Sequence, residues 1–491
     1  MDAKKDRGFL GQPLGLRTLF LTEFWERFSY YGMRAILLFY MYFAVEKGGL
    51  GMDQTTAASI MAIYGAMVYM TGVVGGWISD RILGPRRTVF WGGVLIMFGH
   101  IVLSLPIGEG GLFGSIVLIT LGTGLLKPNV SDMVGSLYTE KDPRRDSGFS
   151  IYVMGINLGS LFAPMVVQWT AAKFNYHAGF SLAAIGMFIG LIVYWIDGRK
   201  YLPEDGLHAP DPINTDERSK AISRLVYGLV AVAVIVIVMF FTHTLTIENA
   251  INIISALGII LPIIYFVVML RSKKVTKIER SRVIAYIPLF IAAVVFWAIE
   301  EQGSVIMALL VAEQTQLHFA GFNLQPGSFQ SLNPFFIIIY TPFFAWFWIK
   351  LGKRQPSSPS KFWMGLVFTA ASYFLLVLPL MNISAGDKIS PLWLVGQWAL
   401  IEVGEMLISP VGLSATTKLA PKAFSSQMMS MWFLADSAGQ SINAQLVKLF
   451  KPGVPSNEMA FFGITAIVVL ITGILLAILV PKIKPLMKGV N

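Results

Sequence analysis

The sequence predicts an all-α polytopic membrane protein with fourteen transmembrane helices. First, 55% of its 491 residues are hydrophobic and only 13% are charged, whereas about 25% of the residues in soluble domains are charged. Second, apolar stretches of about 20 residues, the length needed to cross a hydrocarbon core ~30 Å thick, recur along the whole chain. Third, the basic residues gather in alternate loops, as they do in membrane proteins of fixed orientation.

The apolar stretches give the expected helices in chain order. The first six are 17–43, 55–82, 86–106, 112–137, 147–170 and 176–196. Two nearly pure aliphatic stretches follow at 221–241 and 247–270. The last six are 282–311, 328–350, 361–381, 391–417, 424–447 and 458–481. We expect the first stretch to remain in the mature protein, because it is too long and too charged for a cleavable signal peptide.

The loops differ in charge. Of the 38 Lys and Arg residues, five lie in or beside the loops that follow odd-numbered stretches, three lie inside stretches, and the other 30 lie on the opposite side. Since loops rich in Lys and Arg stay in the cytoplasm, both termini are expected to be cytoplasmic. This topology and contacts with anionic lipids account for the net charge of +10, so no nucleic-acid partner is expected. The absence of cysteine excludes disulfides and thiol chemistry.

A polar segment divides the chain. Residues 197–220 are rich in Pro, Asp and Glu, as expected of a cytoplasmic linker. The resulting order of six, two and six stretches predicts two six-helix bundles that flank a central site. The expected units are an N-terminal bundle at 1–198, a linker with two additional transmembrane helices at 199–280, and a C-terminal bundle at 281–491.

The first stretch contains four charged residues within "EFWERFSYYGMR" at 23–34. On a helix with about 100° per residue, its polar side chains share one arc of roughly 140°. These side chains are Glu23, Glu26, Arg27, Tyr30, Tyr31 and Arg34. Because a lone charge at the bilayer centre costs at least ~2.5 kcal/mol, this arc must face a water-filled cavity or partner charges.

Other stretches contain the partner charges. Lys127 lies in the fourth stretch, and the carboxylates at similar depth are Glu300, Glu301, Glu402, Glu405 and Asp436. Three cations thus face seven carboxylates, so some of the carboxylates are expected to bind protons reversibly. Cations on one half and acids on the other also match a zwitterion, such as an amino acid, a peptide or a betaine. The structural alternative is a set of ion pairs that only holds helices together.

Three ordered motifs resemble those of the proton-dependent oligopeptide transporters, the peptide-transporter (POT/PTR2) family of the major facilitator superfamily. They are "EFWERFSYYG" at 23–32, "GGWISDRILGPRRTVFWGG" at 75–93 and "FSIYVMGINLGSLFAP" at 149–164. The resemblance implies a bacterial member with the major facilitator fold in the plasma membrane. It also implies a symporter that imports di- and tripeptides together with protons by alternating access.

The resemblance assigns roles to single residues. The positions that match the proton-coupling charges are Glu23, Glu26, Arg27 and Glu301. The positions that match the substrate-binding residues are Tyr30, Tyr31, Arg34, Tyr69, Lys127, Asn157, Trp297, Asn333, Glu405 and Trp432. The positions that match the gating loop between core helices 2 and 3 are Gly76, Asp80, Arg81, Gly84, Arg86 and Arg87. Glu301 is preferred over Glu300 because the family acid lies four residues after a tryptophan, here Trp297.

Within this site the resemblance implies that the cations and the acids bind different ends of the peptide. Arg34 and Lys127 are expected to bind the peptide carboxylate, and Arg34 also to pair with Glu301. Glu405 is expected to bind the peptide amino terminus, helped by Asn333. The tyrosines and the asparagine of the fifth stretch are expected to line the peptide backbone, and Trp432 to form a wall of a side-chain pocket.

Other functions remain as alternatives. A membrane-embedded enzyme would need a nucleophile or metal motif, and H-E-x-x-H, G-x-S-x-G and the phosphate-binding G-x-x-x-x-G-K-[ST] are all missing. A passive channel or receptor suits mid-membrane charges on both halves less well than alternating access does. The nearer rival is a proton-coupled carrier of the same family for nitrate or a drug-like zwitterion. No cofactor, metal or obligate protein partner is expected; the expected partners are peptides, protons and the lipid bilayer.

Overall fold

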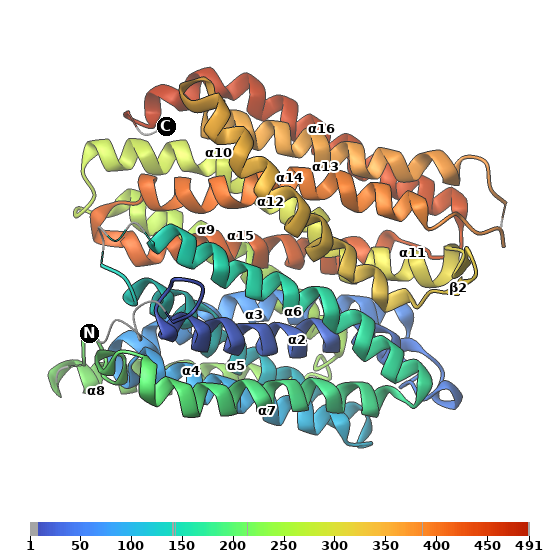
Figure 1. Ribbon diagram of the computed structural model, residues 1–491, viewed down its shortest axis with the longest axis horizontal. Helices are drawn as coiled ribbons and strands as arrows, with labels where there is room; N and C mark the ends of the chain where they lie inside the picture. Colours follow the sequence, from blue (N-terminus) through green and yellow to red (C-terminus); the bar gives the residue numbers. More distant parts are fainter. Residues whose placement is uncertain (1–7, 140–141, 143, 214, 385, 490–491) are drawn as a thin grey trace.

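The computed structural model describes residues 8–139, 142, 144–213, 215–384 and 386–489, and the fold is helical almost throughout. Long helices run side by side along the longest axis of the molecule (Figure 1). The N-terminal half lies below in that view, in blue to green, and the C-terminal half lies above, in yellow to red. The start of α2 and the end of α16 lie toward the same end of the molecule.

The helices follow the expected stretches closely. The first six are α2 (Leu14–Tyr42), α3 (Gln54–Ile78), α4 (Pro85–Ser104), α5 (Gly108–Ser136), α6 (Arg145–Lys173) and α7 (Tyr176–Tyr201). The linker is followed by α8 (Thr215–Phe241) and α9 (Ile247–Arg271). The C-terminal half contains α10 (Lys277–Glu300), α11 (Ile306–Gln314), α12 (Leu332–Leu351), α13 (Ser358–Leu380), α14 (Leu392–Leu419), α15 (Ser425–Leu446) and α16 (Pro455–Leu486).

Short elements join the helices. The only sheet in the described ranges is a two-stranded antiparallel hairpin of β1 (His318–Phe319) and β2 (Phe322–Asn323). Five π-helical residues, Ser79–Leu83, extend α3. Single 3-10 turns occur at Val45–Lys47, Glu204–Leu207, Glu301–Ser304, Pro326–Ser331, Gly352–Arg354, Lys422–Phe424 and Val447–Leu449.

Side-chain caps fix where several helices begin. The carboxylate of Asp53 accepts a hydrogen bond from the Thr56 amide (2.9 Å) at the start of α3. At α10, Thr276 and Glu279 form a reciprocal capping box. Such caps satisfy amide groups of the first helical turn that have no partner within the helix.

Eleven helical segments among the described residues are long and apolar enough to cross a membrane. Three helices are not among them: α2 and α15 contain many polar or charged residues, and the apolar part of α8 is shorter, Val226–Phe241. Every expected stretch nevertheless overlaps a helix. One expectation was incomplete: the ninth stretch, 282–311, is not one continuous helix, since the 3-10 turn Glu301–Ser304 separates α10 from α11. The protein is a multi-pass membrane protein.

Each half packs around its own helices. In the N-terminal half α2 packs against α6 and α7, and α4 and α3 pack against α5. In the C-terminal half α13 packs against α14 and α16, and α10 against α15. Small residues allow close approach: a Cβ atom on Gly75 of α3 would lie 1.9 Å from the Gly124 carbonyl oxygen of α5. The halves meet where α3 packs on α15 and where α6 packs on α12.

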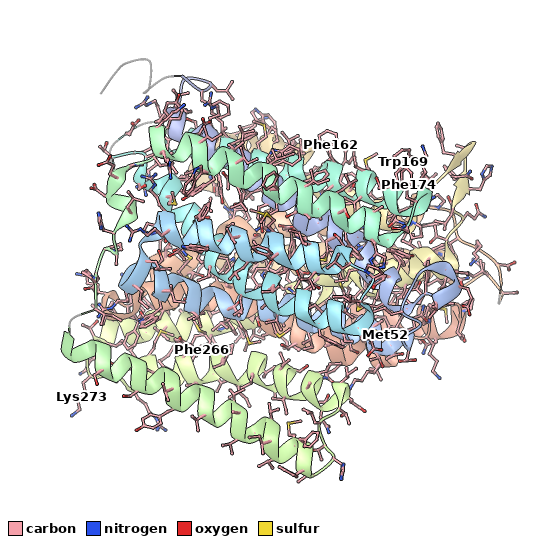
Figure 2. All side chains as sticks on the ribbon, turned by 90° about the horizontal axis from the view of Figure 1, so that it is seen from below. Met52, Phe162, Trp169, Phe174, Phe266 and Lys273 are labelled. Atoms are coloured by element: carbon pink, nitrogen blue, oxygen red, sulfur yellow. The ribbon has the colours of Figure 1, made fainter. Side chains whose placement is uncertain are left out.

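The additional helix pair stands at one side of the molecule (Figure 2). Phe266 of α9 is buried against Phe290 of α10, with the ring centroids 5.2 Å apart. The apolar residues of α8 from Val226 to Phe241 are largely exposed, as expected of a lipid-facing helix. The expected unit boundaries at 198/199 and 280/281 fall inside helices, because α7 continues to Tyr201 and α10 begins at Lys277.

Candidate functional site

A cavity of about 1250 Å³ lies between the two halves. Its deep end is lined by Arg34, Tyr69 and Glu301, and its other end by Gln355, Lys418 and Lys484, near the ends of α12, α14 and α16. It therefore reaches from the middle of the helices toward the end of the molecule where α16 ends.

The halves touch beyond the deep end of the cavity. The Ser59 hydroxyl donates to the Ala444 carbonyl oxygen (3.1 Å), and the Ser437 hydroxyl donates to the Ala66 carbonyl oxygen (3.0 Å). On the other side of the contact, the Ser331 hydroxyl donates to Leu161 (2.7 Å). These contacts join the halves on one side, whereas the cavity lining extends toward the opposite ends of α12, α14 and α16.

The first charge cluster belongs to α2 alone. The Arg27 Nε atom lies 2.9 Å from the Glu23 carboxylate and 2.5 Å from the Glu26 carboxylate. All three side chains are at most 3% exposed. A buried arginine is thus shared by two acids, and Lys127 of α5 also acts on the charge of Glu26.

The second cluster joins the halves. The Arg34 guanidinium lies 3.1 Å from the Glu301 carboxylate and donates to the Ser304 hydroxyl (2.6 Å). It also contacts the hydroxyl of Tyr30 (3.4 Å), and the guanidinium of Arg27 lies 5.5 Å from the centre of the same ring. Because α10 ends at Glu300, Glu301 and Ser304 lie in the irregular turn and both reach Arg34.

A third group surrounds Lys127. Its ammonium lies 4.0 Å from the centre of the Tyr69 ring, and no salt bridge to it occurs among the described residues. Asp436 of α15 interacts with both Tyr69 and Lys127, and it accepts a hydrogen bond from the Gln440 amide (2.8 Å). Tyr69 lines the cavity, whereas Lys127 lies behind it.

The acids of the C-terminal half form a fourth group. The Asn333 amide donates one hydrogen bond to Glu300 and one to Glu402, and each has a donor–acceptor distance of 2.8 Å. Oxygen atoms of Glu300, Glu402 and Glu405 all lie within 4.8 Å of one another. The sequence led us to expect that Asn333 assists Glu405, and Asn333 acts on Glu405 as well as on the other two acids. Three carboxylates so close together without a described cation provide a site for a proton or an ammonium group.

The aromatic residues differ in position. Trp297, Tyr31 and Asn157 line the cavity, whereas Tyr30 and Trp432 are buried beside it. Trp432 packs edge-on against Trp297, with the ring centroids 6.3 Å apart. Trp432 therefore supports a cavity wall through Trp297.

The expected gating loop contacts the linker. The Arg86 guanidinium donates to the carbonyl oxygens of Gly198 (2.8 Å), Pro203 (3.2 Å) and Leu202 (3.3 Å), and Arg81 forms an ion pair with Asp211. The Asp80 carbonyl oxygen accepts from the Asp211 amide (3.0 Å). Gly84 has a φ of +79° and leaves no room for a side chain beside the backbone of His208. Gly76 has open space beside it and Arg87 is exposed.

Comparison with known proteins agrees with this geometry. The sequence profile of the POT family matches residues 86–461. The chain belongs to the POT family. It is therefore a transporter and not an enzyme, as the sequence predicted.

Relatives of this POT transporter match over nearly its whole length. A di-/tripeptide transporter of Lactococcus lactis subsp. cremoris is 49% identical over 500 residues, which cover 99% of each chain. The crystal structure of a peptide transporter POT in complex with sulfate has a TM-score of 0.95 and 54% identity, and it covers 99% of both chains. A POT family transporter in complex with 5-aminolevulinic acid has a TM-score of 0.92 and 44% identity, over 97% of this chain and 98% of that one.

Proposed function

We propose that this transporter imports di- and tripeptides together with protons across the plasma membrane by alternating access. The observation that carries the proposal is the Arg34–Glu301 ion pair, which joins the two halves at the deep end of the cavity. A group that binds Arg34 competes with Glu301, so substrate binding and the contact between the halves are linked.

The charges of the cavity suit the two ends of a peptide. A peptide carboxylate requires cations, and Arg34 and Lys127 supply them from the N-terminal half. A peptide ammonium group requires acids, and the group of Glu405, Glu300 and Glu402 supplies them from the C-terminal half. A short zwitterion would then bridge the halves, while the large cavity leaves room for different side chains.

Proton coupling follows from the same competition. When the peptide carboxylate takes Arg34, Glu301 loses its cation in a poorly hydrated place and binds a proton. Glu23 and Glu26, which share Arg27, tune the same set of charges through Lys127. We assign Tyr31, Tyr69 and Asn157 to the peptide backbone and the Trp297–Trp432 pair to a side-chain pocket.

The finer topology belongs to the same proposal. All fourteen helical stretches cross the membrane, both termini are cytoplasmic, and the described cavity faces the cytoplasm, in line with Lys361, Lys418 and Lys484 at its mouth. Residues 1–198 and 281–491 rock against each other, and residues 199–280 form the linker and the helix pair. Arg81 and Arg86 control the opening of the cavity by binding the segment after α3 to the linker and to the end of α7.

Uptake of labelled dialanine into liposomes that contain the purified protein tests the proposal. We expect accumulation only with an inward proton gradient, and inhibition by unlabelled dipeptide but not by alanine or nitrate. 5-Aminolevulinic acid serves as a second competitor, because a related structure contains it. Accumulation of another zwitterion without any dialanine uptake would transfer the function to that solute and contradict the peptide assignment.

A further inference from the structure

Asp436 is a buried acid at the contact between the two halves that the competition at Arg34 does not use. It lies on α15 and is 4% exposed. Its own helix supplies one partner, the Gln440 amide at 2.8 Å. Two groups of the opposite half act on its charge: Tyr69 of α3 and Lys127 of α5, whose ammonium lies 4.0 Å from the centre of the Tyr69 ring.

The charges around Asp436 are unevenly divided between the halves. The N-terminal half contributes the cation, Lys127, and the neutral hydroxyls of Tyr69 and Tyr30. The C-terminal half contributes like charges, Glu301 from the turn after α10 and Glu300 from α10 itself. An ionised Asp436 is thus stabilised by the opposite half and destabilised by its own.

Among the described residues, the elements that pack against α15 on its remaining sides supply no substitute cation near Asp436. From α9, Asn252 and Ser255 contact Gln445, toward the end of α15. From α14, Glu402 and Glu405 are negative and belong to the group around Asn333. Lys448 lies three turns further along and pairs with Glu248.

Asp436 also marks the point where the two halves close. Ser437, the next residue, donates to the Ala66 carbonyl oxygen of α3 (3.0 Å). One turn further along α15, the Gln440 side chain lies against Gly65 of α3. A Cβ atom on Gly65 would be 1.5 Å from the side-chain oxygen of Gln440. Opening the cavity toward the other side requires this contact between α3 and α15 to separate.

We propose that Asp436 is a second proton-coupling residue, which exchanges its interaction with Lys127 for a proton when α3 and α15 separate. This inference rests on the proposed function. Separation moves Tyr69 and Lys127 away with the N-terminal half and leaves Asp436 beside Glu301. A proton on Asp436 removes that repulsion and frees Lys127 for the substrate carboxylate. When the halves close again, Lys127 returns and the proton leaves into the cavity.

The proposal predicts that one proton fewer is transported with each peptide in the variant Asp436→Asn. Proteoliposomes are held at zero membrane potential with a pH difference of about one unit, and the final accumulation ratio of dialanine is measured. Since each coupled proton contributes a factor of ten per pH unit, the variant should accumulate about tenfold less than the wild type. Dialanine counterflow without a gradient should persist, and Asp436→Glu should restore the accumulation ratio.

The outcomes separate this inference from the proposed function. An unchanged accumulation ratio in Asp436→Asn would overturn the second proton while leaving the symport intact. Equal loss of counterflow in Asp436→Asn and Asp436→Glu would also overturn it, because side-chain shape and not the acid would then be required. If the wild type itself showed no dialanine counterflow, the result would contradict the proposed peptide transport and not only the role of Asp436. Lys448→Met serves as the matched control, because it removes the ion pair with Glu248 after the end of α15 without removing an acid of the cavity, and it should keep the wild-type ratio.

Discussion

Replacing Glu301 with Gln should weaken the contact between the two halves and uncouple uptake from the proton gradient. Arg34 is 4% exposed, so the loss of its ionised partner leaves a buried charge less well stabilised. The change would cost 3–5 kcal/mol if Arg34 lost all its partners. In Glu301→Gln, however, Arg34 keeps two partners, the Ser304 hydroxyl at 2.6 Å and the Tyr30 hydroxyl at 3.4 Å. We therefore expect the loss of one hydrogen bond between charged groups, about 1.5–3 kcal/mol.

This free energy acts on the equilibrium between the two access states. A difference of 1.4 kcal/mol changes an equilibrium constant tenfold, so the closed contact should become about 10- to 150-fold less favoured. Two spin labels can report the change, on Val45→Cys after α2 and Leu449→Cys after α15. Both positions are exposed, and the natural chain has no cysteine to interfere. The distance between the labels should shift toward longer values in Glu301→Gln.

The matched control is Asp197→Asn, which removes the Arg17–Asp197 ion pair (2.7 Å) within the N-terminal half. This control should leave the label distances unchanged, because it does not join the halves. In transport assays Glu301→Gln should lose gradient-driven accumulation of dialanine and retain counterflow. Wild-type label distances combined with wild-type accumulation would refute the role of the ion pair in both gating and coupling.

Three further substitutions test other parts of the site. Lys127→Ala should abolish accumulation and counterflow of dialanine alike, and normal counterflow would remove Lys127 from the substrate site. Asn333→Leu should weaken dialanine binding at least about tenfold, since two acids lose a hydrogen bond of about 1.5–3 kcal/mol each. If a binding titration showed an equal loss of affinity for N-acetyl-dialanine, which has no free amino group, it would argue against an amino-terminal subsite. Gly65→Leu should separate α3 from α15, because its side chain would overlap Gln440, and unchanged distances between the labels at 45 and 449 would contradict this.

The sequence was sufficient to predict the helices and the faces that carry the charges. Apolar length and helical periodicity are local properties, so the fourteen stretches and the polar arc of α2 could be read directly from the order of residues. The family resemblance added the expectation that Arg34 pairs with Glu301, and this pair is present at 3.1 Å. The remaining residue roles stay predictions until the variants are measured.

What the sequence could not supply are contacts that depend on how helices end and pack. Ser304 reaches Arg34 only because the ninth stretch breaks at Glu301, and the small polar sequence "EEQGS" is the sole local signal of that break. Asn333 has two amide hydrogens and several acids within reach, so only packing decides that Glu300 and Glu402 receive them. Arg86 was predicted to belong to the gating loop between core helices 2 and 3, but the motif does not indicate its acceptors, which are carbonyl oxygens at the end of α7 and in the linker.

The charges of this cavity are best understood as one linked set. Two cations on the N-terminal half face an acid of the other half, and a peptide carboxylate or a proton can compete for each: Arg34 forms an ion pair with Glu301, and Lys127 is attracted by Asp436 without forming a salt bridge. Because both interactions cross between the halves, neither half can move without a replacement for the lost partner, since an unpaired buried charge is strongly disfavoured. A peptide alone replaces the acids on the cations but leaves two carboxylates unpaired, and protons alone neutralise the acids but leave the cations unpaired. Only both together complete the exchange, and this gives a physical reason why peptide and protons should move in the same direction.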